Sequence, residues 1–154
     1  MPHCDPGGQA WIDRDAFAAL VATSCVALVA VVLAEDATTR SVRDGVYTAA
    51  QAERGREVYA AQCEACHKTD LRGEQMTPSL VGVSFAFRWN ERTLYDYLAG
   101  MRATMPQGAP GGLSDAAYVD VLAYILAENG YPSGEVMLVA DAAVLKAIGI
   151  EADF

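Results

Sequence analysis

The chain has 154 residues and a formal net charge of -9, from 11 Lys and Arg against 20 Asp and Glu. Its length is that of one ordinary domain and is too short for two full enzyme domains. The acidic balance excludes binding to a nucleic acid backbone and argues against an anionic membrane surface as a partner. The 53% hydrophobic content is high, but much of it lies in one uncharged run near the N-terminus.

That run extends from Ala16 to Ala34 and approaches the length of about 20 residues that a helix needs to cross a bilayer. We expect residues 1–34 to be either a cleaved signal peptide or a retained signal-anchor. Small residues at Val32 and Ala34 favour cleavage, whereas a run longer than the usual signal core favours an anchor. The flank before it is more acidic than an export signal requires. Both alternatives place the rest of the chain in the periplasm or on the outer face of the cytoplasmic membrane.

Residues 35–47 are expected to be a linker, after which the pattern becomes helical. Thr48 and Gln51 have the spacing of a capping box, which predicts a helix that runs towards Cys63. Glycine inside a helix costs about 1 kcal/mol relative to alanine. We therefore expect Gly55, four residues before Tyr59 on the same face, to allow a close helix crossing.

Further helices are expected at Asn90–Met101, Asp115–Glu128 and from Asp141 onward. The second of these has helical apolar spacing and a stop at Asn129-Gly130, and we expect it to cross the first helix at Gly55. The domain would span 48–132, with 133–154 as a C-terminal extension packed on it.

The chemistry-bearing motif is Cys63-Glu64-Ala65-Cys66-His67, the five-residue signal for covalent haem attachment. Two thiols on one helical turn point the same way and can add to the two vinyl groups of one haem. The next residue lies about 100° further round the helix, which brings its imidazole under the iron. The motif predicts one haem c bound through Cys63 and Cys66, with His67 as the proximal iron ligand.

Other interpretations of the motif are weaker. A structural zinc site needs four ligands, and no other Cys or His follows Cys25. A thioredoxin-like redox pair needs a βαβ unit, whereas the flanking segments are predicted to be helical. A structural disulfide between Cys63 and Cys66 would leave the adjacent His67 without a role.

A second axial ligand would be a methionine, a water molecule or nothing. The candidate methionines are Met76, Met101, Met105 and Met137. Met105 is the predicted distal ligand, because Pro106 biases it towards an extended conformation in a loop rich in Gly and Pro. In the alternative, Met105 only fills the pocket and the iron is five-coordinate.

Ligand identity determines the expected function. A thioether favours Fe(II), and with both axial positions filled no site is open to substrate. Since the sequence shows no nucleophile–base constellation and no phosphate-binding loop, we expect one-electron transfer and no enzyme activity. An empty distal face would instead suit a gas-binding or sensor haem protein.

From Val46 to Pro132 the sequence resembles the class I cytochrome c family. The matching features, in order, are Gly55 with Tyr59, the CEACH motif, Pro78-Ser79-Leu80-Val81-Gly82, Thr104-Met105-Pro106, and Leu122-Ala123-Tyr124-Ile125-Leu126. The resemblance implies an all-α fold with crossing N- and C-terminal helices and haem-wrapping loops. It also implies a monohaem electron carrier that accepts electrons from a dehydrogenase and passes them to a cytochrome or an oxidase. Segments near Ser41–Thr48 and Pro110–Ser114 are similar to the small cytochromes found with bacterial quinoprotein dehydrogenases.

Less specific expectations concern the surroundings of the haem. The aromatic residues expected to line the porphyrin, or else to belong to the core, are Phe85, Phe87, Trp89, Tyr95 and Tyr97. The possible donors to the haem propionates are Trp89, Arg88 and Arg72. The segment Ala103–Leu113 has no charged residue, and we expect it to form an apolar docking surface for redox partners.

Overall fold

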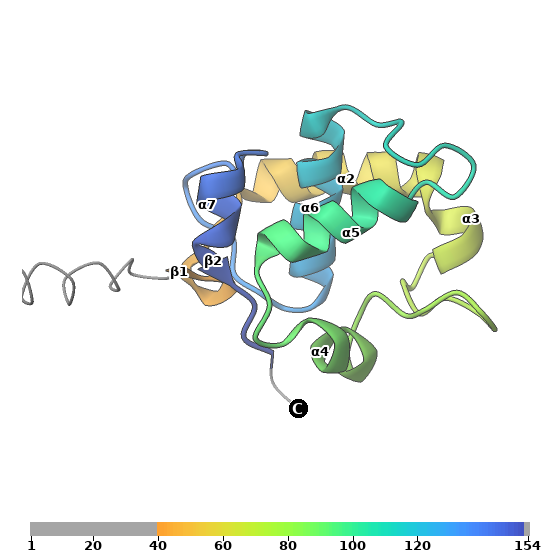
Figure 1. Cartoon of the computed structure of the whole chain (residues 1–154), viewed down its shortest axis with the longest axis horizontal. Helices are drawn as coiled ribbons and strands as arrows, with labels where there is room; N and C mark the ends of the chain where they lie inside the picture. Colours follow the sequence, from red (N-terminus) through yellow and green to blue (C-terminus); the bar gives the residue numbers. More distant parts are fainter. Residues whose placement is uncertain (1–39, 153–154) are drawn as a thin grey trace, which may run out of the picture. The chain divides into compact units, whose positions relative to one another are not determined.

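The computed structural model describes residues 40–152, which are mostly helical (Figure 1). The elements in chain order are β1 (Arg40–Ser41), the 3-10 helix η1 (Val42–Asp44), α2 (Ala49–Gln62), α3 (Glu64–His67), α4 (Val83–Trp89), α5 (Leu94–Thr104), α6 (Asp115–Glu128), α7 (Ala142–Lys146) and β2 (Ile148–Gly149). The described residues are mostly helical, in agreement with the expected all-α class, and β1 and β2 add one small parallel pair of two-residue strands. Within the described range, no helix combines the length and the apolar character needed to cross a membrane. The expected signal or anchor segment, residues 1–34, lies outside the described residues.

Helices α2 and α6 cross at the centre of the body (Figure 1). Thr48 begins α2, since its hydroxyl accepts a hydrogen bond from the Gln51 N–H at 3.2 Å. A β-carbon at Gly55 would overlap the main-chain carbonyl of Asp120 in α6. The predicted close crossing at Gly55 is therefore confirmed, and a residue without a side chain is what permits it.

Helix α6 has the predicted bounds and forms the middle of the core. Its residues from Tyr118 to Leu126 are all buried. It ends at Asn129, and Gly130 follows with a φ of 82°. The Asn129 amide also donates to the carbonyl of Leu80 at 3.0 Å, so the end of α6 holds the loop that precedes α4.

The predicted helix Asn90–Met101 is wrong in its bounds. The chain leaves the helical conformation at Asn90, and α5 begins after Thr93 with a capping box closed by Asp96. Helix α4, which precedes this break, was not expected. The apolar spacing continues across the break, so periodicity alone could not place it.

Residues 40–47 do not form the expected linker. Val42, Val46 and Tyr47 are buried in the core. The Tyr47 hydroxyl donates to the carbonyl of Tyr131 at 2.6 Å. Burial of these apolar side chains makes the segment part of the packed body.

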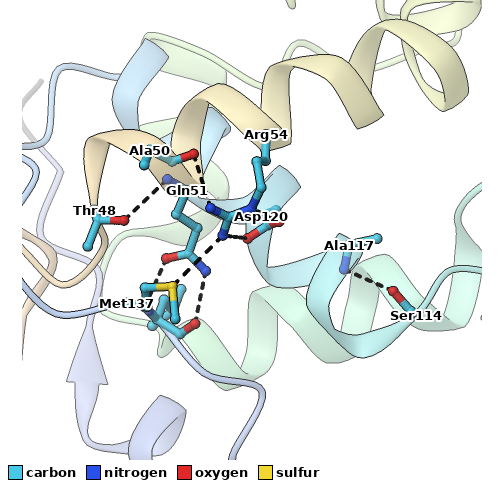
Figure 2. A network of polar contacts seen from close by, with 9 residues as sticks. Thr48, Ala50, Gln51, Arg54, Ser114, Ala117, Asp120 and Met137 are labelled. Atoms are coloured by element: carbon cyan, nitrogen blue, oxygen red, sulfur yellow. Dashed lines mark hydrogen bonds and ion pairs between the residues drawn. The ribbon is translucent and has the colours of Figure 1, made fainter.

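The C-terminal segment is held on α2 by a buried side chain (Figure 2). The amide of Gln51 donates to the carbonyl of Leu138 and accepts from its N–H, both at 2.9 Å. Gln51 thus does not complete the capping box that its spacing suggested. Beside it, Arg54 makes two hydrogen bonds to the Asp120 carboxylate, at 2.9 and 3.0 Å. Polar side chains of α2 therefore hold both α6 and the C-terminal segment against this helix.

Candidate functional site

A cavity of about 540 Å³ lies among α2, α3, α4, α5, α6 and the loops between them. Its volume falls in the range of roughly 300 to 1,000 Å³ that suits an organic cofactor. The sequence-predicted site residues that line it are Cys63, Cys66, His67 and Met105. The structure thus brings together residues from α3 and from the segment after α5.

One cysteine comes just before the short helix α3 and the other, Cys66, lies within it. Cys63 is its N-cap, and the Cys63 carbonyl accepts from the N–H groups of Cys66 at 3.1 Å and of His67 at 2.9 Å. Both thiols are free, and Cys63 is half-buried whereas Cys66 is exposed. Burial, reinforced by the nearby Cys66, raises the pKa of the Cys63 thiol to about 11. The thiol is therefore neutral at ordinary pH, unlike the low-pKa thiolate of a redox-active cysteine pair.

The His67 side chain is buried and oriented by a backbone carbonyl. Its residue is only 5% exposed, and Nδ1 lies 3.1 Å from the carbonyl oxygen of Pro78. Since a carbonyl only accepts, Nδ1 must carry the proton, which leaves the Nε2 lone pair available for a metal. Burial lowers the pKa of His67, and the Pro78 bond opposes this only in part. The imidazole is thus held in the neutral form that a metal ligand requires.

Three of the four candidate methionines line the cavity. Met105 follows the last residue of α5 in an extended conformation, with φ -127° and ψ 151°, as expected for a residue before proline. Met76 is 95% exposed at the rim, and Met101 packs partly against the core. Met137 is not among the lining residues and has its sulfur 3.9 Å from the Arg54 guanidinium. The geometry is compatible with Met105 as an axial ligand, which stays a prediction.

Three backbone hydrogen bonds hold Met105 in place. Its N–H donates to the Met101 carbonyl at 2.7 Å. Its carbonyl accepts from the Tyr118 hydroxyl at 2.7 Å and from the Gly111 N–H at 3.3 Å. The residue is therefore anchored to both α5 and α6.

The cavity walls combine apolar surface with a few polar groups. Trp89 and Tyr97 lie with ring centroids 4.4 Å apart, and Val121 and Ile125 of α6 add aliphatic surface. Tyr97 is buried, with 3% of its surface exposed, and lines the cavity. A mainly apolar wall with a few polar groups fits a planar organic cofactor that carries polar groups at one edge.

Several expected cofactor contacts lie elsewhere. Phe85 packs in the core beside Tyr97, while Phe87 is 86% exposed. Tyr95 carries the Lys146 ammonium over its ring, 4.6 Å from the centroid. These three aromatic residues do not line the cavity.

Of the possible propionate donors, Arg88 and Trp89 line the cavity, whereas Arg72 does not and lies 3.9 Å from Asp70. Two residues with clear roles were missed from the sequence, Pro78 beside His67 and Tyr118 beside Met105. Both act through hydrogen bonds to a main-chain carbonyl between residues more than ten positions apart. A pattern of residue types in the sequence does not reveal such bonds.

Residues 50–125 match the protein family described as cytochrome c oxidase, cbb3-type, subunit III. The matched segment begins in the first turn of α2, ends within α6, and contains the cysteines, His67 and Met105. None of the curated proteins and none of the solved structures matches the chain.

Proposed function

We propose, from the premise that this chain belongs to the class I c-type cytochromes through the domain at residues 50–125, that it is a monohaem carrier of single electrons. The observation that carries the proposal is the single cavity lined by Cys63, Cys66, His67 and Met105. Haem c, the group that this family binds covalently, supplies an iron that changes between Fe(II) and Fe(III).

The side chains of this protein would hold that group in complementary ways. Cys63 and Cys66, on one helical turn, would hold it by adding their thiol S–H groups across its two vinyl groups. His67 presents Nε2 to the proximal face, because Pro78 occupies its Nδ1–H. Met105 offers its thioether to the distal face, where a soft ligand favours the reduced iron.

Two axial protein ligands leave no coordination position for a substrate, which supports electron transfer and argues against an enzyme. The competing function is a five-coordinate haem that binds a gas or acts as a sensor. Met105 distinguishes the two, since a carrier needs it bound to the iron and a sensor needs the distal face open.

Redox proteins are the partners that this function requires. The segment from Ala103 to Leu113 has no charge, and from Gln107 to Gly112 it is exposed beside the cavity. We propose it as the docking surface for a dehydrogenase of the quinoprotein class as donor and a cytochrome or oxidase as acceptor. The protein would work in the periplasm or on the outer face of the cytoplasmic membrane, with Ala16–Ala34 as a signal or anchor.

The test is covalent attachment in the full chain produced with a cytochrome c maturation system. The protein should retain one haem per chain after acid-acetone extraction. Replacement of both Cys63 and Cys66 by serine should release it. A haem that extracts freely from the unmodified protein would refute the proposal, and carbon monoxide binding by the reduced protein at a rate typical of an open site would favour the sensor.

A further inference from the structure

Tyr118 connects the first turn of α6 to the segment that presents Met105. Its side chain is buried, and its hydroxyl donates to the Met105 carbonyl at 2.7 Å. The other hydrogen bond to that carbonyl, from Gly111, is longer at 3.3 Å. The hydrogen bond from the Tyr118 hydroxyl is therefore the shorter of the two that the Met105 carbonyl accepts.

The ring of Tyr118 also makes a cation–π contact, which restrains it. The Arg102 guanidinium lies over it, 5.5 Å from the ring centroid, and donates to the Asp115 carboxylate at 2.6 Å. Arg102 belongs to α5 and Asp115 begins α6, so the contact joins the two helices that border the Met105 segment. These contacts restrict the movement of the Tyr118 ring, and its hydroxyl therefore stays within hydrogen-bond distance of the Met105 carbonyl.

We propose that Tyr118 is a positioning residue for the distal axial ligand. The segment after Met105 is rich in glycine, with Gly111 at a φ of 73°, and so has little intrinsic rigidity. The hydrogen bond from Tyr118 limits the movement of the Met105 backbone and thereby keeps its thioether at the cavity. This inference rests on the proposed function, because it concerns the same iron site.

The test is competition for the distal position in the oxidised, haem-loaded protein. Added imidazole displaces the methionine: the iron–sulfur bond breaks, an iron–nitrogen bond forms, and the oxidation state is unchanged. We expect Tyr118→Phe to bind imidazole about two- to tenfold more tightly than the unmodified protein, which corresponds to the loss of one hydrogen bond.

Tyr47→Phe is a matched control. It removes a buried hydroxyl that donates to a main-chain carbonyl, that of Tyr131 at 2.6 Å, and Tyr47 does not line the cavity. Both variants should lose similar stability to denaturant, but only Tyr118→Phe should change the imidazole affinity. Equal affinities in the two variants would overturn the inference and leave the proposed function intact. If instead Met105→Ala binds imidazole no more tightly than the unmodified protein, Met105 is not the ligand and the ligand assignment of the proposed function fails.

Discussion

Gly55 in α2 lies directly against the main chain of Asp120 in α6, with no room for a β-carbon between the helices. Helix α2 leads into Cys63, and α6 contributes Val121 and Ile125 to the cavity wall. The separation of the two helices at this crossing therefore sets the distance between the turn that carries Cys63 and the opposite wall.

The crossing predicts that Gly55→Ala destabilises the fold. The new methyl group would overlap the Asp120 carbonyl and approach the Tyr124 β-carbon at 2.9 Å. Overpacking costs about 1 to 3 kcal/mol or more, which exceeds the gain of about 1 kcal/mol in helix propensity. Urea denaturation should show a lower midpoint. Gly108→Ala, where a β-carbon meets nothing within 4 Å, should leave it unchanged.

Gln51→Leu should release the C-terminal segment from α2. The substitution leaves the N–H and the carbonyl of Leu138 buried without their present partner. Since each of these two groups costs about 1 to 3 kcal/mol, we expect a loss of about 2 to 6 kcal/mol in the free energy of unfolding. Hydrogen exchange at Leu138 should accelerate. Gln107→Leu, an exposed change without such partners, should alter neither measurement; unchanged exchange in Gln51→Leu would contradict the prediction.

Asp96 should contribute stability that disappears in acid. Hydrogen bonds from the Thr93 backbone N–H and then from its hydroxyl lower the pKa of Asp96. A carboxylate with a depressed folded pKa stabilises the fold above its unfolded value of about 3.9, and this contribution is lost as pH falls through the folded pKa. The stability difference between the unmodified protein and Asp96→Asn should therefore be larger at pH 6 and shrink below about pH 4. A stability difference that stays the same from pH 6 to below about pH 4 would contradict the prediction.

Met105→Ala should abolish the weak near-red absorption band that reports a thioether bound to ferric haem iron. The band should persist in Met76→Ala and Met101→Ala, although both residues also line the cavity. These variants are matched controls, since each removes one thioether from the same cavity. Loss of the band in Met76→Ala alone would assign the distal ligand to the loop before α4.

The uncharged docking segment predicts a local electrostatic effect on electron transfer. Gln107→Lys places a positive charge at the cavity rim and should speed oxidation of the reduced protein by an anionic reagent such as ferricyanide at low ionic strength. Glu135→Gln also raises the net charge by one, through the loss of a negative charge, but it lies outside the lining residues and should have a smaller effect. The two rates should converge near 1 M salt, where the Debye length falls to about 3 Å. Equal acceleration in both variants would show that net charge alone steers the reagent.

Local patterns in the sequence predicted much of this fold. Thr48, Asn129 and Asp141 act at helix ends as expected, because capping depends on one residue and its near neighbours. The crossing at Gly55 was predictable because a glycine inside a helix needs a compensating contact. The motif at Cys63–His67 was recognisable because its spacing carries its own chemistry.

The remaining features depend on contacts between distant segments. The break at Asn90 is stabilised by a hydrogen bond that its side chain accepts from the N–H of Ala152. Ala152 is the last of the described residues, so the two partners are far apart in the chain. Val42 is fully buried, and the residues just before it, Arg40 and Ser41, pair with Ile148 and Gly149 more than 100 residues later, which no local window reveals. The orientation of His67 depends in the same way on a carbonyl that follows it in a loop.

The pairing of β1 with β2 also determines how the body responds to a mechanical load. Arg40 lies opposite Ile148 and Ser41 opposite Gly149 in parallel register, and the Arg40 N–H donates to the Ala147 carbonyl at 2.7 Å. A force that pulls Arg40 and Gly149 in opposite directions along the strands would load all hydrogen bonds between the two strands at once. The bonds would then break at the same time and not one after another. The pair therefore resists extension before any strain reaches the helices that border the cavity.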